Sequence, residues 1–424
     1  MTTMNCSMMT QRRILPAVGC LTAALLCSLV AAAPAGAANF DLVPSLTVSE
    51  EWNDNIFETA ANRRTDFITR AQPGFTSRYQ APVWRWDMGY AFDYHHYARG
   101  SRGDEYTHNA DLRGTVTLLD NLLFLDVSDT YHRVTLDVAR TVVTESSLFL
   151  NQTDQNNAAV SPYLQWRLGQ KNSLRTGYRF TDIRYWGDGV ERQEHGAFAD
   201  FSHEVTAKFS LSAGYAYTRL ESEPTRFDKH DVSGGFRYEY ADRSFVFGQV
   251  GNSWQQFLGG TGVNYLFWNA GLTHDLGGAV AVLETRLQTA VDPLAVTTRE
   301  TSYSGRIEKT LDRGLLSFAA AYLEFSDSQN NGSIRKRLSF TAAGRYEVFP
   351  DITANLAVTT ERFSRRAADD YPYHLVAGGG VSWAFKDNLT LGVTYYYATQ
   401  RREIDRSTAA IDTSRAMLEV RKAF

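Results

Sequence analysis

The chain has 424 residues, and its 43 Lys and Arg against 47 Asp and Glu give a formal net charge of −4 at pH 7. These charges are spread over the whole length without a basic stripe or a block of one sign, so we expect neither a nucleic-acid partner nor a long disordered tail. All three cysteines, Cys6, Cys20 and Cys27, lie near the N-terminus, which excludes disulfides, thiolate metal sites and a cysteine nucleophile from the remainder.

The first 37 residues have the parts of a secretory signal peptide. A basic pair at Arg12-Arg13 precedes an apolar run that extends to Ala33, and Ala35-Gly36-Ala37 supplies the small residues of a cleavage site. We therefore expect residues 1–37 to be removed and residues 38–424 to form one domain. No later segment approaches the roughly 18 consecutive apolar residues of a membrane-spanning helix, so none is predicted.

Alternation of apolar and polar residues begins early in the mature chain and continues to its end. From residue 84 to residue 94 the even positions are Trp, Trp, Met, Tyr, Phe and Tyr, whereas the odd positions from 85 to 95 are Arg, Asp, Gly, Ala, Asp and His. This period of two predicts β-strands with one apolar and one polar face. The same pattern recurs near residues 112–118, 163–168, 353–359 and 389–397.

Short turn signals separate pairs of strands at regular intervals. They lie at residues 80–82, 119–121, 169–172, 207–208, 241–243, 275–278, 311–314, 349–351 and 386–388, and looser polar connections alternate with them. Nine short turns imply ten hairpins. The prediction is therefore an all-β fold, a transmembrane antiparallel up-and-down β-barrel of about 20 strands (range about 16–22), with short periplasmic turns and longer extracellular loops. In lipid, only a closed sheet leaves no unpaired strand edge.

The ends of the strands carry two further signals. Aromatic residues there are predicted to form interfacial girdles, with a sugar-binding track as the alternative: Trp52, Tyr97, Tyr131, Trp186, Tyr217, Tyr240, Trp254 and Tyr371. The last strand finishes at Phe424. It resembles the C-terminal signal that the barrel-assembly machinery recognises in outer-membrane proteins of Gram-negative bacteria, although Lys422 departs from the pattern.

The polar face of the strands is predicted to line the lumen, because a charge on the lipid face near the midplane costs roughly 2–4 kcal/mol. This assigns the following charged residues to the lumen: Arg85, Asp87, Asp93, Arg113, Arg167, Arg175, Arg179, Glu284, Arg286, Arg345, Glu361 and Arg415. The plainer interpretation of each is that it pairs across neighbouring strands and holds the wall in register. The segments 54–64 and 137–151 are candidates for folding inward as constrictions.

No pattern in the sequence indicates catalysis or a bound cofactor. The candidate clusters are Asp93 with His95 and His96, and Asp369 and Asp370 with His374. Adjacent strand residues face opposite sides of a sheet, so His95 and His96 do not share a site, and the second cluster fits a solvated loop. No nucleophile elbow, phosphate loop or metal-ligand spacing occurs. We expect no enzyme activity, no cofactor and no metal.

Two stretches near the start of the mature chain carry a resemblance to a known family. Residues 51–57 read Glu-Trp-Asn-Asp-Asn-Ile-Phe, and residues 66–75 read Asp-Phe-Ile-Thr-Arg-Ala-Gln-Pro-Gly-Phe. Together with Tyr90, Tyr94 and Tyr97, they resemble the outer-membrane β-barrel porins of exopolysaccharide loci, including those that accompany exosortase and PEP-CTERM systems. The specific match covers only the first three strands.

The resemblance implies a non-enzymatic channel that exports an exopolysaccharide. Its implied partners are outer-membrane lipid, the barrel-assembly machinery, a polysaccharide cargo and export-system proteins, and it supplies no catalytic residues. A general diffusion porin for small solutes and a structural sheath around a partner protein are the alternatives for the same wall.

Overall fold

The computed structural model describes residues 38–119, 121–136, 152–223, 225–291, 293–294, 297–327, 333–364, 372–386, 388–402 and 410–424. The predicted signal peptide and the candidate constriction at 137–151 lie outside these residues. In the described part of the chain, twenty strands follow one another, and no helix is long and apolar enough to cross a membrane.

The strands have between 12 and 17 residues each. They are β1 (Asn39–Asn53), β2 (Asp66–Gln80), β3 (Trp84–Tyr97), β4 (Glu105–Leu118), β5 (Leu123–Thr135), β6 (Gln152–Arg167), β7 (Asn172–Trp186), β8 (Arg192–Thr206), β9 (Phe209–Ser222), β10 (Arg226–Ala241), β11 (Ser244–Phe257), β12 (Gly262–Asp275), β13 (Ala279–Val291), β14 (Thr297–Leu311), β15 (Gly314–Asp327), β16 (Ser333–Phe349), β17 (Ile352–Phe363), β18 (Tyr373–Ala384), β19 (Leu389–Arg401) and β20 (Ala410–Ala423).

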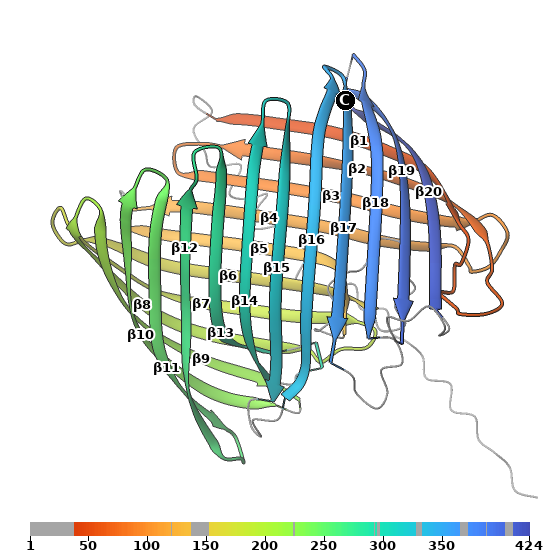
Figure 1. Ribbon diagram of the computed structural model, residues 1–424. Helices are drawn as coiled ribbons and strands as arrows, with labels where there is room; N and C mark the ends of the chain where they lie inside the picture. The colour runs from red at the N-terminus through yellow and green to blue at the C-terminus, as the bar shows by residue number, and fades with distance from the viewer. Residues whose placement is uncertain are drawn as a thin grey trace, which may run out of the picture.

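Each strand pairs antiparallel with its neighbours in the sequence. The first strand also pairs with the last, with Ser45 opposite Ala423 and Asn53 opposite Arg415. The sheet is therefore a closed barrel, in which β1 to β3 pass behind β16 to β18 in the view of Figure 1. Closure leaves no free strand edge, and the predicted up-and-down barrel of about 20 strands is confirmed.

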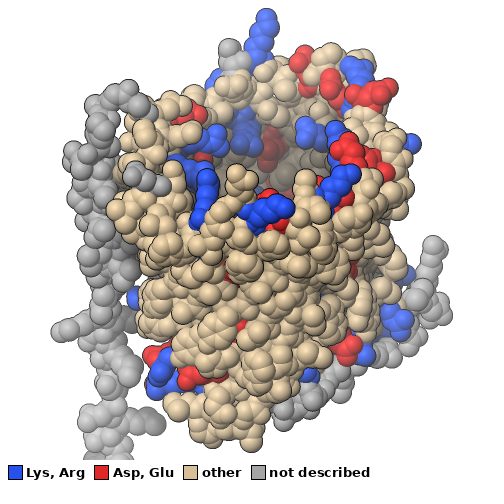
Figure 2. Space-filling view, turned by 90° about the vertical axis from the view of Figure 1, so that its left-hand side faces the viewer, with Lys and Arg blue, Asp and Glu red and all other residues tan. Residues whose placement is uncertain are grey.

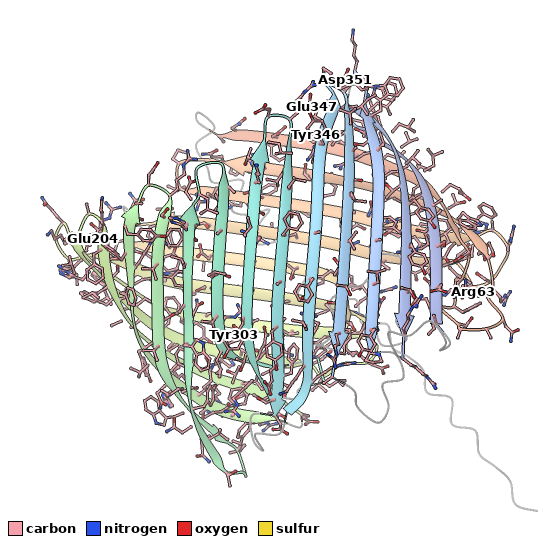
Figure 3. The ribbon with its side chains drawn as sticks, viewed as in Figure 1. Arg63, Glu204, Tyr303, Tyr346, Glu347 and Asp351 are labelled. Carbon is pink, nitrogen blue, oxygen red and sulfur yellow. The ribbon has the colours of Figure 1, made fainter. Side chains whose placement is uncertain are left out.

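The two ends of the barrel differ. The nine short turns of the sequence lie between β2 and β3, β4 and β5, and so on to β18 and β19, at the same end as the C-terminus (Figure 1). We call this the turn end and the opposite one the loop end. In Figure 3, Glu347 and Asp351 mark the turn end, whereas Arg63, in the connection between β1 and β2, marks the loop end.

Cross-strand partners lie on the same side of a sheet, so the pairing register divides the strand residues into two faces. The outer face carries the most exposed large apolar side chains of the wall, among them Leu266, Phe318 and Leu356. The inner face lines a cavity of about 690 Å³ beside β1 to β5 and β20, where Thr47 and Arg70 lie. Figure 2 shows the hollow of the barrel with basic and acidic side chains around it, above a wall of mostly uncharged residues.

Charged residues of the outer face gather near the ends of the strands. Arg133, Arg219 and Lys336 illustrate those at the loop end. Asp129 lies nearer the middle of β5, where the Asn156 amide donates a hydrogen bond to its carboxylate. An apolar band therefore runs around the outside. Because about 9–11 residues of a tilted strand cross the hydrocarbon of a membrane, strands of this length extend beyond it at the loop end.

Candidate functional site: the inner face of the barrel

The pairing register places the twelve charged residues assigned to the lumen on one face, the inner face. Seven of them form ion pairs with another residue of this face: Asp87 with Arg78, Asp93 with Arg70, Arg113 with Asp111, Arg175 with Asp126, Arg286 with Glu300, Glu361 with Arg337, and Arg415 with Glu51. Sequence analysis did not name these seven partners, although the same alternation identifies them. Within the described residues, no ion pair involves the other five, which are Arg85, Arg167, Arg179, Glu284 and Arg345.

The most enclosed of these ion pairs joins β2 to β3. Arg70 Nε lies 2.6 Å from Asp93 Oδ1, and Arg70 Nη2 lies 2.5 Å from Asp93 Oδ2. The two side chains are only 17% and 7% exposed, and His95 Nε2 lies 3.1 Å from the same carboxylate. A bidentate arginine–carboxylate pair fixes orientation as well as charge. This pair therefore holds the wall rather than offering a free charge to a solute.

Four of the predicted residues lie around one cavity. Arg85 and Asp87 of β3, Arg113 of β4 and Arg179 of β7 line a space of about 450 Å³ on the inner face. Glu284 and Arg286 of β13 lie elsewhere on the wall. The structure thus brings together residues that are almost 100 positions apart in the sequence, which the alternation of single strands does not predict.

At the loop end the inner face buries apolar side chains among its polar ones, which sequence analysis missed. Ten buried side chains form this apolar belt: Ile68, Tyr97, Ile183, Tyr185, Leu220, Phe227, Phe257, Tyr265, Phe325 and Phe363. Leu220, Phe227 and Phe257 pack together as one cluster. Above the belt, the Val190 N–H of the β7–β8 connection donates to the carbonyl oxygen of Pro293, between β13 and β14, at 2.8 Å. The belt and this bond narrow the loop end.

The candidate constriction at residues 54–64 lies against the inner face. Its Ile56 is buried with Ile68 and Tyr97 of the belt. Asn55, also fully buried, donates from Nδ2 to the carbonyl oxygens of Thr59 and Asp412, each at 2.9 Å. The segment is therefore fixed to β20, the neighbouring strand across the closure of the barrel.

Asp66, at the start of β2, links the connection between β1 and β2 to the connection between β3 and β4. Its carboxylate accepts hydrogen bonds from the backbone N–H groups of Phe67 (2.8 Å), Arg99 (2.7 Å) and Ser101 (3.0 Å). Arg99 and Ser101 belong to the connection between β3 and β4, so one buried carboxylate organises two connections at the loop end.

The prediction of an interfacial girdle position is wrong for one aromatic residue, Tyr97. Tyr97 lies on the inner face, buried in the apolar belt, and its hydroxyl donates to Glu105 at 3.1 Å. The reason is its position: it continues the odd, polar positions of β3 and not the even ones. The register places Trp52, Tyr131, Trp186, Tyr217, Tyr240 and Trp254 on the outer face. Tyr371 lies outside the described residues.

The candidate catalytic clusters do not form a site in the part of the chain that the structure describes. His95 faces inward beside Asp93, whereas His96 is on the outer side and contacts Asp104 at 2.9 Å. Asp369 and Asp370 lie outside the described residues. Among the residues that are described, no group of three His, Cys, Asp or Glu side chains is placed to hold a metal ion.

The C-terminal Phe424 lies at the turn end, just after β20. Its N–H donates to the carbonyl oxygen of Pro44 in β1 at 2.9 Å, and its ring remains exposed. The end of the chain therefore completes the pairing that closes the barrel, while the aromatic ring stays on the outside.

No model of a known protein family matches the sequence, and no curated protein is significantly similar to it. Solved outer-membrane barrels are similar in structure. The apoprotein of the FrpB iron transporter from Neisseria meningitidis (F5-1 variant) is 10% identical, with a TM-score of 0.53 over 90% of this chain and 81% of that chain. The open form of the ferric-catecholate import receptor Fiu from E. coli K12 is also 10% identical, with a TM-score of 0.52 over 91% and 82%. The chain thus has the fold of an outer-membrane β-barrel.

Proposed function

We propose that the protein is a non-enzymatic channel of the outer membrane and that it passes an exopolysaccharide to the outside. One observation carries the proposal: the closed wall has an apolar outer face and an inner face of charged, hydroxyl-bearing and small residues around a hollow. The first face suits lipid and the second suits a hydrated solute. The turn end is then periplasmic and the loop end extracellular.

The inner face of β14 to β18 suits a sliding sugar chain. Midway along these strands it presents Ser304, Ala321, Thr341, Ala357 and Gly378, none of which carries a charge or a large side chain. Hydroxyl groups replace water in hydrogen bonding to a sugar, and short side chains leave the passage wide. A conduit needs contacts that are weak enough to release the cargo, and the middle of these strands offers such contacts.

The ion pairs of the inner face support the same function differently. Charges that are already paired, as Arg70 is with Asp93, stabilise the wall and do not grip a passing polymer. The resemblance of the first strands to porins of exopolysaccharide loci supplies the polysaccharide cargo, the export-system proteins as partners and the barrel-assembly machinery that inserts the chain. In this proposal a partner protein supplies the energy for export.

A general diffusion porin is the second candidate, and the apolar belt favours it. Buried rings such as Phe227 and Phe257, together with the bond between Val190 and Pro293, narrow the loop end. A narrow mouth admits small solutes more readily than a polymer. In this alternative the same inner face carries ions and small nutrients.

An in-frame deletion tests the two candidates. We would weigh the polysaccharide in the medium and in the periplasm of the deletion strain, and restore the wild-type gene as the control. Loss outside with accumulation inside, reversed by the gene, is the expected result. Unchanged export, combined with an open-channel current of the purified protein in a planar bilayer, would reject polysaccharide export in favour of the diffusion porin.

A further inference from the structure

Among the inner-face arginines that have no ion pair or hydrogen bond to another described residue, two lie at one cavity. They are Arg85, near the turn end of β3, and Arg179, in the middle of β7. Both side chains are exposed, and both line the 450 Å³ cavity together with Arg113 of β4. A space of this size is within the range of about 300–1,000 Å³ that small-molecule sites occupy.

The acidic residues of the cavity already have partners of their own. Asp87 pairs with Arg78 at 2.6 Å. Asp126 lies 3.8 Å from Arg175 and accepts a hydrogen bond from Thr115 at 2.9 Å. Neither carboxylate is therefore the counter-ion of Arg85 or Arg179.

The charges around the cavity do not balance. Three arginines (Arg85, Arg113 and Arg179) and two aspartates (Asp87 and Asp126) line it. Both aspartates form ion pairs with arginines outside the lining, and Arg113 forms one with Asp111. The guanidinium groups of Arg85 and Arg179 are left without an acidic partner among the described residues. They present planar, fork-shaped donors, the geometry that binds carboxylate and related oxyanions in a bidentate manner.

Neutral groups complete the lining. The hydroxyls of Ser128 and Tyr163 make no hydrogen bond to another described residue, and both residues line the cavity. The Tyr163 ring stacks on Phe124, with the ring centroids 5.1 Å apart and the planes at 10°, and the guanidinium of Arg175 lies 4.0 Å from its centroid. The ring is thus fixed, and its hydroxyl is placed to bond a sugar hydroxyl.

We infer that this cavity binds a stretch of acidic sugar units, with one carboxylate or related oxyanion at Arg85, another at Arg179, and sugar hydroxyls at Ser128 and Tyr163. The inference rests on the proposed export of a polysaccharide and narrows its cargo to an acidic glycan. The site extends from the turn end, which is the proposed periplasmic entrance, to the middle of the barrel. A glycan that enters from the periplasm would therefore meet Arg85 first and Arg179 second.

Binding is measured on the purified mature protein in mild detergent, by fluorescence anisotropy of a labelled oligogalacturonate. Arg85→Gln and Arg179→Gln are the test variants. Arg345→Gln is the matched control, because Arg345 is an inner-face arginine of β16 that also has no ion pair and lies outside this cavity. Each test variant should weaken binding about tenfold, as expected for the loss of one charge-assisted contact, and the control should bind as the wild type does.

Competition by unlabelled compounds identifies the ligand class. An unlabelled oligogalacturonate should displace the probe, whereas a neutral maltooligosaccharide of the same length and inorganic phosphate should not at equal concentration. Equal displacement by the neutral sugar, or by phosphate, would overturn the acidic-glycan site. So would wild-type affinity in both test variants, or an equal loss in Arg345→Gln, which would indicate a diffuse field instead of a site.

The binding result and the export result fail separately. If the deletion strain loses export but both test variants bind normally, the channel stands and this site is wrong. If the deletion strain exports normally while the two variants lose binding, the site is real and the export function is wrong.

Discussion

Replacing Asp66 with alanine tests whether one buried carboxylate organises the loop end. Its two oxygens accept three backbone hydrogen bonds, from Phe67, Arg99 and Ser101, and the residue is 0% exposed. A hydrogen bond to a charged group contributes about 1.5–3 kcal/mol, and a buried donor left without a partner costs about 1–3 kcal/mol. Since the three bonds share one acceptor group, we expect a loss of about 3–5 kcal/mol rather than their full sum.

The assay combines two measurements on the refolded barrel in lipid vesicles. Urea unfolding gives the change in global stability, and hydrogen exchange reports whether the amides of Arg99 and Ser101 lose protection. Asp104→Ala is the control in the same connection. Asp104 accepts a hydrogen bond from the Tyr94 hydroxyl at 2.6 Å but is half exposed, so its loss should cost no more than about 1 kcal/mol. Equal losses in the two variants, with unchanged exchange at Arg99 and Ser101, would refute the anchoring role.

Two further substitutions test the packing of the wall. Gly251→Ala should destabilise the barrel by about 1–3 kcal/mol, because the new Cβ would lie 2.5 Å from the carbonyl oxygen of Val232; Gly89→Ala, with no atom within 4 Å, should unfold at the wild-type urea concentration, and equal midpoints would refute the clash. Arg70→Met leaves the enclosed carboxylate of Asp93 with only His95 beside it and should cost about 3–5 kcal/mol. The double variant with Asp93→Leu should recover most of that loss in the same unfolding assay, and no recovery would contradict the charge argument.

The architecture could be predicted from the sequence because every strand of a barrel wall has one face toward lipid and one toward the lumen. Alternation assigns each residue to a face, and the short turns count the hairpins. Alternation and turn signals each depend only on residues close together in the sequence, so they can be recognised without knowing how distant parts of the chain pack. This is why all nine turns and the strand number agree with the structure, and why partners such as Arg78 and Asp126 follow from the same rule even though they were not named.

The loop end could not be predicted in this way, because burial there depends on which connection covers which strand. Tyr97 was assigned to a girdle from its residue type, whereas its odd position in β3 already placed it inside. Ile68 and Phe227 occupy the alternate positions that face inward with the polar residues, but they are buried at the loop end. Parity states which side a residue faces. It does not state whether water or another part of the chain meets it there.

The difference between the side that a residue faces and what it contacts there also matters for the cargo. The residues that carry the family resemblance, Asn55 and Asp66 above all, are fully buried and bonded to neighbouring backbone. Their physical role is to fix connections at the loop end, so a match at these positions bears directly on how the barrel is built and only indirectly on what passes through it. What passes is decided by side chains that face the hollow and have no partner there. In the described part of the wall, Arg85 and Arg179 are the two such cations that share a cavity, and the nature of the cargo therefore depends on them more than on the family motif.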